Sequence, residues 1–279
     1  MLRDSTALPN LQVLPTANLV LHEHGDPRRV ARLCERLREE GKLKNPPIVA
    51  PIPGSERFVV LDGANRTLAL QKLGIPHVVA QVVSYDDPGV ELHTWYHVVT
   101  GMSRKEFMAA LEEVTGLRLI PCTLQEARAA LAVGDAAAYI VFEDAVYRVG
   151  DGDRDRLADI RLLNDLVAAY QGRAQIFRAS NDVYEKQAPY YPDITALVVF
   201  PRYRPADIIA LAREGAKVPS GITRHIIPNR ALRINIPLSV LEADWPLEQK
   251  QAWLHDWLME RMAANAIRYY SEPTFLFDE

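Results

Sequence analysis

The sequence predicts a mixed α and β fold in two parts, and three observations support this prediction. Apolar stretches with strand character alternate with amphipathic helical stretches along the whole chain. The length of 279 residues is enough for one large domain or two ordinary ones. Strand-rich sequence gives way to helices near Gly101, so we expect one domain over residues 1–100 and a mixed α/β domain over residues 101–279.

In the first part, a helix is predicted between Asp26-Pro27 and Gly41, because its apolar residues recur at helical spacing and proline and glycine are typical helix boundaries. The apolar stretches PPIVAPI (46–52) and RFVVL (57–61) are predicted strands. The stretch VVLDGANRTLALQKLGIPHVVAQVV (59–83) indicates a strand, a tight turn, a helix closed by glycine, and a second strand.

In the second part, the capping boxes Ser103–Glu106 and Thr123–Glu126 each predict a helix start. We expect a hairpin that turns near residues 143–144, helices over residues 153–172, 204–215 and 246–270, a buried strand over 194–201, and two short strands within 224–238. The Trp253–Trp257 spacing places both rings on one packed face of the last helix.

Composition limits the class of protein. Apolar content of 48% and charged content of 24% are typical of a soluble globular protein, and a net charge of −4 with a pI near 6.0 disfavours sequence-independent binding to duplex nucleic acid. Residues 1–10 contain an acid and a proline without an apolar core, unlike a signal peptide, and no stretch approaches the roughly 18 apolar residues of a membrane span. We therefore expect a cytoplasmic location. Two distant cysteines, Cys34 and Cys122, argue against disulfides and a cysteine zinc site.

The turn at residues 62–67 has the features of a phosphate site. A helix N-terminus carries unpaired N–H groups and partial positive charge, which stabilise a phosphate. Gly63 allows close approach of a ligand, Arg66 can grip phosphate oxygens, and Asp62 can hold Mg²⁺ or orient a hydroxyl. The structural alternative is that Asp62 or Asn65 caps the helix and Arg66 is solvated, and spacing alone leaves both open. The stretch is not a P-loop.

A second anomaly is the segment from Gly215 to Leu241, which is rich in cationic residues and has no acid. Such a segment attracts phosphate, carboxylate or a nucleic-acid backbone. The alternative is a strand edge protected by charge. Its basic side chains are Lys217, Arg224, His225, Arg230 and Arg233.

Stretch 59–83 resembles the Asp-Gly-x-x-Arg, helix, Leu-Gly, strand signature of the ParB/sulfiredoxin fold. That superfamily includes chromosome-partition proteins, sulfiredoxins and kinases that phosphorylate free L-serine with ATP or ADP. Sulfiredoxins need a cysteine in this loop, where this chain has Ala64 and Asn65. Partition proteins carry a helix-turn-helix, whereas the two helices predicted after Gly101 are separated by the strand-like LRLIPCT (117–123).

Three further motifs in the same order resemble the free serine kinase branch: residues 21–49, with a glutamate before the first helix; ELHTWYHVV (91–99); and KVPSGITRHIIPNRALRINIPL (217–238). Ala64 and Asn65 stand where many members of that branch have two histidines. The resemblance implies a ParB/sulfiredoxin-like N-terminal domain followed by an α/β domain, with L-serine and a nucleotide bound between them. It does not reveal ATP or ADP preference or oligomeric state.

The resemblance also implies residue roles. Glu23 is the general base that accepts the serine hydroxyl proton, and Trp95 lines the pocket. The phosphates lie on the loop, with Mg²⁺ bridging them and Asp62 positioning the metal or the hydroxyl. The loop set is Asp62, Gly63, Ala64, Asn65, Arg66 and Thr67; the set for the serine carboxylate or product phosphate is Lys217, Ser220, Thr223, Arg224 and His225.

Other interpretations stay open at this point. Glu23 can be a solvated loop residue, Trp95 a core residue, and His22 with His24 two metal ligands that lack a third. The alternative function is a nucleotide-sensing, DNA-binding regulator, which would keep the phosphate loop without needing Glu23.

Overall fold

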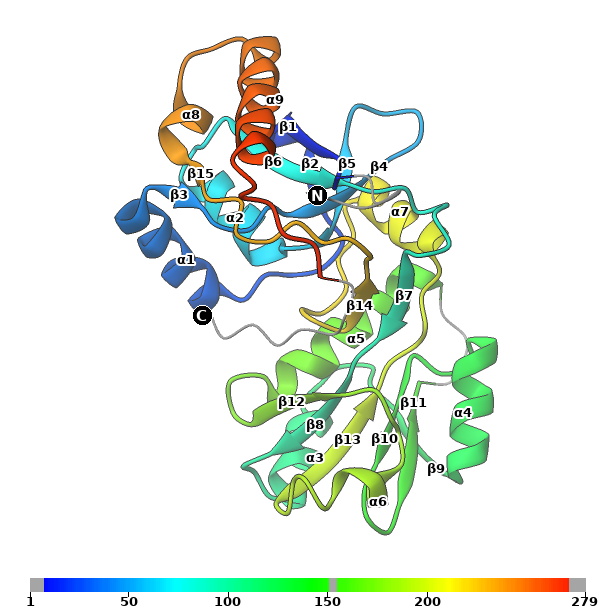
Figure 1. The fold of residues 1–279 in the computed structure, drawn as a ribbon. Helices are drawn as coiled ribbons and strands as arrows, with labels where there is room; N and C mark the ends of the chain where they lie inside the picture. Colours follow the sequence, from blue (N-terminus) through cyan, green and yellow to red (C-terminus); the bar gives the residue numbers. More distant parts are fainter. Residues whose placement is uncertain (1–7, 151–154, 271–279) are drawn as a thin grey trace.

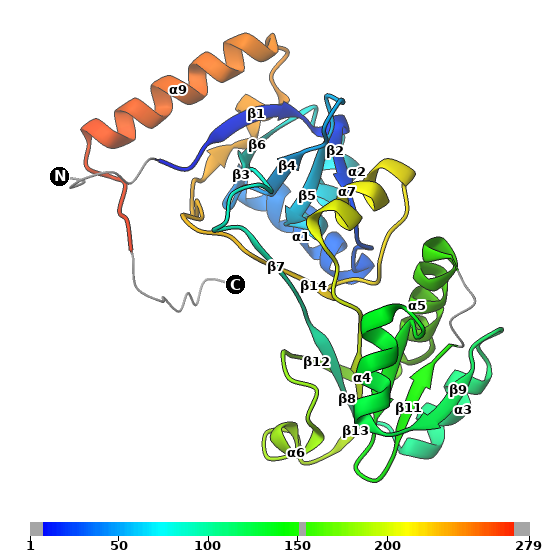
Figure 2. The same ribbon diagram turned by 90° about the vertical axis from the view of Figure 1, so that its right-hand side faces the viewer.

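The computed structural model describes residues 8–150 and 155–270. The expectation about the first residues of the chain, and the start of the helix predicted from residue 153, fall outside these ranges. The described chain forms two lobes, which lie one above the other in Figure 1 and are joined by the segments that run between them in Figure 2. Each lobe is built around its own sheet.

The first lobe contains a five-stranded sheet in the order β1-β6-β4-β5-β2. β2 pairs with β5 and β4 with β6 in parallel, and the other pairs are antiparallel. Strand residues alternate between two buried faces, since Val60 packs with α1 and α2 and its neighbours Val59 and Leu61 pack toward α7. The elements are β1 Leu11–Pro15, η1 Thr16–Asn18, β2 Leu19–Leu21, α1 Pro27–Glu40, β3 Lys42–Leu43, β4 Ile48–Pro51, β5 Phe58–Asp62, α2 Ala64–Lys72 and β6 His77–Val82.

The second lobe contains a six-stranded antiparallel sheet in the order β12-β8-β13-β10-β11-β9. Residues from α3 and α5 join its larger core, and residues from α4 and α6 pack with the smaller one. The elements are β8 Tyr96–Thr100, α3 Arg104–Glu112, β9 Leu119–Cys122, α4 Leu124–Val133, β10 Ala138–Val141, β11 Val146–Val149, α5 Arg156–Tyr170, β12 Gln175–Ala179, α6 Tyr184–Gln187 and β13 Ile194–Val199.

The C-terminal segments return to the first lobe. β7 (Glu91–Thr94) and β14 (Thr223–Ile226) form an antiparallel ribbon that runs between the lobes (Figure 2). Side chains of the last segments then join the core of the first lobe, among them Ile236 and Leu254. These segments are β15 Ile236–Pro237, which pairs with β3, α8 Leu238–Glu242 and α9 Leu247–Ala263.

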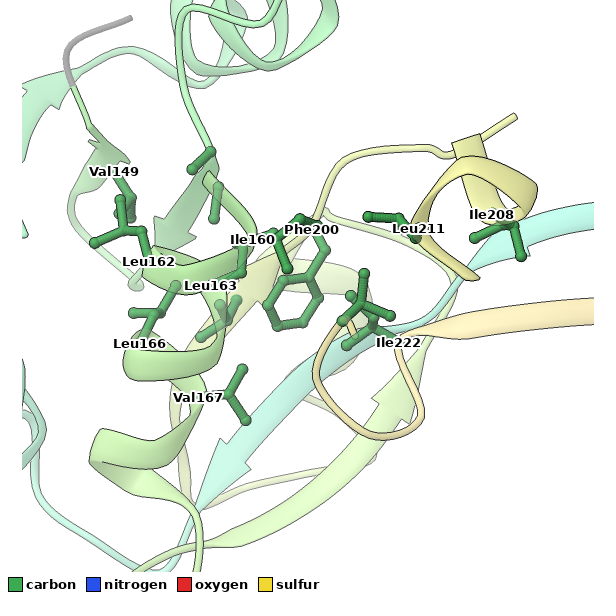
Figure 3. Close-up of a cluster of buried hydrophobic side chains, with 14 of the residues drawn as sticks. Val149, Ile160, Leu162, Leu163, Leu166, Val167, Phe200, Ile208, Leu211 and Ile222 are labelled. Atoms are coloured by element: carbon green, nitrogen blue, oxygen red, sulfur yellow. The ribbon is translucent and has the colours of Figure 1, made fainter. Parts of the chain in front are cut away.

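α7 (Pro205–Glu214) and the loop after it connect the two cores. Figure 3 shows Phe200 of the second lobe between α5 and Ile222, with Leu211 and Ile208 of α7 beyond. All four side chains are completely buried. Burial of each such side chain stabilises the fold by roughly 1.5–3 kcal/mol, so the loop at residues 215–222 has a firmly fixed base.

Most predicted elements are confirmed, including both capping boxes and the 143–144 hairpin. The last helix is shorter than predicted: it ends at Ala263 and not near residue 270. The predicted strand character of residues 117–123 is confirmed by β9, which separates α3 from α4. Both cysteines are free, and Trp253 stacks on Trp257 as expected.

The division at residues 100 and 101 stays a prediction about domains. In the structure, β8 lies just before that position and belongs to the second sheet, while α8 and α9 pack on the first lobe. Among the described residues, no helix is both long and apolar enough to cross a lipid bilayer.

Candidate active site

Glu23 lies on the loop between β2 and α1, at the junction of the lobes. Backbone hydrogen bonds fix this loop on both sides of Glu23: Val218 N–H donates to the His22 carbonyl at 2.9 Å, and His24 N–H donates to the Val218 carbonyl at 3.0 Å. The Glu23 carboxylate accepts hydrogen bonds from the Gly221 N–H at 3.0 Å and the Thr223 hydroxyl at 3.2 Å. Glu23 is therefore a positioned carboxylate and not a free loop side chain.

Burial raises the pKa of Glu23 above its ordinary value. The Gly221 and Thr223 hydrogen bonds and the positive charge of Arg178 oppose this rise, and the negative charge of Asp62 adds to it. A carboxylate with a raised pKa is a better proton acceptor than a solvated one, which suits a general base.

The Thr223 hydroxyl lies between two hydrogen-bond acceptors, the Glu23 carboxylate and the His22 ring. His22 is buried, and its pKa is lowered to about 4 by burial, so the ring is neutral near pH 7. Its Nδ1 is 2.8 Å from the Val60 carbonyl, which can only accept, so Nδ1 carries the hydrogen and Nε2 is an acceptor 3.0 Å from the Thr223 hydroxyl.

The Thr223 hydroxyl has one hydrogen, so it can donate to Glu23 or to His22 but not to both. When Glu23 is ionised, the hydroxyl donates to the carboxylate. When Glu23 has taken up a proton, the carboxyl can donate to the Thr223 oxygen, and the hydroxyl turns to His22. This arrangement accommodates both protonation states of Glu23 without a change in position.

The loop at residues 62–67 opens helix α2. Gly63 is the N-cap residue with φ 93°, and the helix has no side-chain cap, unlike α1, α3, α4 and α5. Asp62 instead pairs with Arg230, and the Asn65 side-chain oxygen accepts from the Asp26 N–H at 2.7 Å. The alternative that Asp62 or Asn65 caps the helix is therefore wrong, since the N-cap residue is Gly63 and no side-chain cap is formed within the described ranges.

Asn65 and Gly25 bring the Glu23 loop against this helix. The Asn65–Asp26 hydrogen bond joins the N-termini of α1 and α2. A Cβ atom at Gly25 would lie 2.2 Å from Leu68 Cδ1 and 3.1 Å from the Asn65 oxygen, so a larger residue would force these side chains to move. Besides burial, the negative charge of Asp62 raises the pKa of Glu23, so the two carboxylates lie within electrostatic reach of each other.

The remaining loop residues have different surroundings. Arg66 is half-buried and donates to the Pro46 carbonyl at 3.0 Å. Ala64 and Thr67 are buried, and the Thr67 hydroxyl has no partner among the described residues. Ala64 can contribute its backbone N–H to a ligand, whereas the Thr67 N–H already donates to the Gly63 carbonyl at 2.9 Å. Arg66 and Asp62 can contribute side chains.

The C-terminal set is divided by strand alternation on β14. Thr223 and His225 face the His22 side, where the His22 and His225 rings meet edge to face at 5.6 Å. Arg224 faces the other way, with its guanidinium 4.2 Å from the centre of the Trp95 ring. Trp95 is only half-buried, so its ring remains accessible to a ligand beside Arg224.

His225 differs from the other members of this set. It is buried, its Nε2 lies 2.6 Å from the Tyr85 hydroxyl, and burial lowers its pKa to about 3. It therefore offers a neutral ring and no positive charge near pH 7. Lys217 is half-buried, and desolvation together with its charge lowers the pKa of His24. The half-buried Ser220 forms no side-chain hydrogen bond within the described ranges.

The interpretation of His22 and His24 as metal ligands is not supported. His22 faces the interior and His24 is exposed, and no group of three or more His, Cys, Asp or Glu side chains suited to a metal occurs in the described part of the chain. Two hollows on the described surface, one beside α8 and one between β1 and α9, are lined by neither Glu23 nor the 62–67 loop.

Sequence reasoning missed four residues at this site: Gly25, Arg178, Gly221 and Arg230. Arg230 belongs to the cationic segment, so its charge was visible in the sequence, but its pairing with Asp62 was not. The two glycines act through the absence of a side chain, and Arg178 lies on a strand that the sequence did not predict.

Comparison with known proteins gives a consistent result. No protein-family model matches the sequence. The ATP-dependent L-serine kinase SbnI of Staphylococcus aureus is 25% identical over 278 residues, covering 97% of this chain and 98% of that protein. An ATP-dependent L-serine kinase of Staphylothermus marinus is 28% identical over 257 residues, covering 85% of this chain and 95% of that protein. The ADP-dependent L-serine kinase SerK of Thermococcus kodakarensis is 24% identical over 224 residues, covering 79% and 88%.

Solved structures give the same fold. A free serine kinase in complex with AMP matches with a TM-score of 0.72 at 20% identity, covering 85% of this chain and 95% of that one. SbnI from Staphylococcus aureus, truncated at its C-terminus, matches with a TM-score of 0.71 at 22% identity, covering 90% and 97%. The predicted fold class is confirmed, and both lobes are included in the match.

Proposed function

We propose that this chain, which belongs with the free L-serine kinases in sequence and in fold, transfers a phosphoryl group from ATP or ADP to the hydroxyl of free L-serine. Similarity to three named L-serine kinases, which covers 97%, 85% and 79% of this chain, supports this function. The structural observation that carries it is the position of Glu23, whose carboxylate is held by Gly221 and Thr223 beside the uncapped start of α2.

In the proposed reaction, the nucleotide phosphates lie at the N-terminus of α2, where the N–H groups of the first turn, Gly63 and the Arg66 side chain bind them. The serine hydroxyl donates a hydrogen bond to Glu23. As the serine oxygen forms its bond to phosphorus, the bond from phosphorus to the bridging oxygen of the nucleotide breaks, and the hydroxyl proton passes to Glu23. The leaving nucleotide takes the electron pair of the broken bond.

The protein residues fit a magnesium ion bound mainly through the nucleotide. Mg²⁺ in kinases is usually held by one or two carboxylates and by phosphate oxygens, and Asp62 offers one partly exposed carboxylate at the loop. When bound, the ion neutralises phosphate charge. Asp62 is paired with Arg230, so this role requires Asp62 to share its oxygens or to exchange partners.

The serine set is also part of this proposal. Arg224, stacked on Trp95, and Lys217 supply positive charge for the serine carboxylate or the product phosphate, with Ser220, Thr223 and His225 as neutral hydrogen-bonding groups. The binding of L-serine and nucleotide at the junction of the lobes remains a prediction. The cytoplasmic location of the protein also remains a prediction. A DNA-binding regulator is not favoured, because the relatives that match nearly the whole chain are named as kinases.

The test is an assay of purified protein with free L-serine, Mg²⁺, and ATP or ADP in parallel, with O-phosphoserine detected by mass. We expect product from the wild type with at least one donor, and none above background from Glu23→Gln. Glu35→Gln, an exposed glutamate on α1, is the matched control and should retain activity. Absence of product with both donors, while nucleotide still binds, would overturn the proposal.

A further inference from the structure

Arg178 on β12 reaches the Glu23 site from the second lobe. Its guanidinium lies directly against Gly221, since a Cβ atom built on Gly221 would stand 2.0 Å from Nη2 and 2.8 Å from Cζ of Arg178. Gly221 is also the residue whose N–H donates to the Glu23 carboxylate at 3.0 Å. The guanidinium therefore occupies the space that a side chain at position 221 would fill. Gly221 stands between it and the Glu23 carboxylate, because Gly221 contacts both.

The guanidinium has no fixed partner. Within the described ranges, Arg178 forms no hydrogen bond or ion pair, whereas Arg29 is 3.9 Å from Asp26 and Arg230 pairs with Asp62. The Arg178 residue is exposed, and its guanidinium is partly desolvated where it lies against Gly221, so some of its five N–H donors remain open at the lobe junction. A guanidinium with free donors beside a general base is available for an anionic ligand.

Arg178 stands within electrostatic reach of both ends of the transfer. Desolvation lowers its pKa, and the charges of Glu23 and Asp62 raise it. Glu23 marks the acceptor hydroxyl, and Asp62 begins the loop that binds the donor phosphates in the proposed function. The neighbouring histidines cannot replace this charge near pH 7, because burial lowers the pKa of His22 to about 4 and of His225 to about 3.

We propose that Arg178 is an arginine finger, supplied by the second lobe, that contacts the phosphoryl group while it passes from the nucleotide to serine. This inference rests on the proposed function. In a loose transition state the charge is spread over the three equatorial phosphoryl oxygens, and a guanidinium placed beside them stabilises that state more than either ground state. The proton still passes to Glu23, and the leaving nucleotide takes the electron pair.

The inference also gives the two-lobed architecture a role. The base and the phosphate loop belong to the first lobe, and Arg178 comes from β12, which pairs with β8 of the second sheet. The register sets Arg178 opposite the buried His97, so the strand position of Arg178 is fixed by the core of the second lobe. Catalysis then requires both lobes, although nucleotide binding requires mainly the first.

The test is a comparison of Arg178→Gln and Arg178→Lys with wild-type protein, in which kcat, the KM for L-serine and the Kd of the nucleotide are measured separately. We expect Arg178→Gln to lower kcat by about 100-fold or more, because single charged donors at phosphoryl transition states have effects of this size or larger. The two binding constants should change by less than about threefold, because the contact is made mainly in the transition state. Arg178→Lys should restore only part of kcat, because ammonium keeps the charge but not the planar fork.

The matched control is Arg173→Gln, an exposed arginine just before β12 that lies 3.7 Å from Glu113 on the surface and should leave kcat unchanged. Circular dichroism verifies the fold of each variant. Arg178→Ala supplies an independent readout, since millimolar guanidinium ion should restore part of its kcat if the missing group acts on the phosphoryl.

Three results overturn the inference. Unchanged kcat in Arg178→Gln shows that Arg178 does not contribute to phosphoryl transfer. An increase of tenfold or more in the serine KM with unchanged kcat assigns Arg178 to the serine carboxylate in the ground state. Loss of folding in Arg178→Gln and Arg178→Lys, without guanidinium rescue of Arg178→Ala, assigns it to structure. Failure of the proposed function is distinguished from all three, because the wild type would then form no O-phosphoserine.

Discussion

The loop that carries Glu23 and the loop that carries Asp62 lie side by side but hold their carboxylates in opposite ways. Glu23 is half-buried, and its direct partners are the neutral Gly221 N–H and Thr223 hydroxyl. The Asp62 side chain is 45% exposed and pairs with the guanidinium of Arg230. Burial raises the pKa of Glu23 and so favours uptake of a proton there, whereas Arg230 places an opposite charge directly on Asp62. In the proposed function, these surroundings suit Glu23 to proton transfer and Asp62 to charge.

Glu23→Gln tests the proton-transfer half of this comparison and should have the largest effect. The amide keeps the size of the side chain but cannot accept the serine proton, so kcat should fall by about 1,000-fold, within the range for general bases. The Kd of the nucleotide should stay within about threefold of wild type, as measured by calorimetry. A fall in nucleotide affinity equal to the fall in kcat would show that Glu23 acts on binding instead.

Asp62→Asn tests the other half and should have an intermediate effect. The amide cannot neutralise Arg230 or support a magnesium ion, so the Mg²⁺ concentration for half-maximal activity should rise by about 10-fold or more. The measurement is a Mg²⁺ titration of the initial rate at saturating nucleotide and serine. A loss of activity that no Mg²⁺ concentration alters would place Asp62 on the serine hydroxyl rather than on the metal.

Gly63→Ala sharpens the comparison by changing the phosphate loop without changing a charge. A Cβ atom at this position would lie 2.9 Å from Arg66 Nη1 and 3.2 Å from Pro47 Cα, at a φ of 93° that favours glycine. Nucleotide affinity should fall by about tenfold, and the free energy of unfolding should fall by about 1–2 kcal/mol.

Gly74→Ala is the matched control for that change. Gly74 also has a positive φ, of 70°, and follows the other end of α2, but a Cβ atom there meets nothing within 4 Å. It should lose stability through backbone strain while nucleotide affinity is retained. Equal losses of affinity in both variants would attribute the effect to strain in α2 and not to the phosphate loop.

The pH dependence gives the smallest effect. Glu23 must be ionised to accept a proton, and burial raises its pKa, so the acidic decline of kcat/KM should begin at a higher pH than for an ordinary glutamate of pKa 4.5. Arg178 lowers the pKa of Glu23, so residual activity of Arg178→Gln should decline at a higher pH than that of wild type. A shift of the decline to lower pH in that variant would contradict the electrostatic link between the two residues.

Much of the fold and part of the site could be predicted from the sequence. The helix at 27–40, the strand-turn-helix-strand at 59–83 and both capping boxes have local causes, namely periodicity, proline, glycine and cap residues, and these were predicted correctly. Strand β12 was missed because its side chains are mostly exposed and give no apolar pattern. The helix after Trp257 was predicted too long, since local propensity does not show where packing against the first lobe ends.

The sequence by itself determined the local conformations and the residue types available for phosphoryl transfer: a glutamate before a helix, a glycine turn with an arginine, and a cationic segment far along the chain. Only the tertiary structure decided which of these meet. Thr223 reaches Glu23 across 200 positions and Arg230 reaches Asp62 across 168, because β14 and the last segments return to the first lobe. Arg178 joins them through Gly221, where the absence of a side chain leaves room for a guanidinium. Such contacts depend on burial and on long-range packing, which no local pattern encodes.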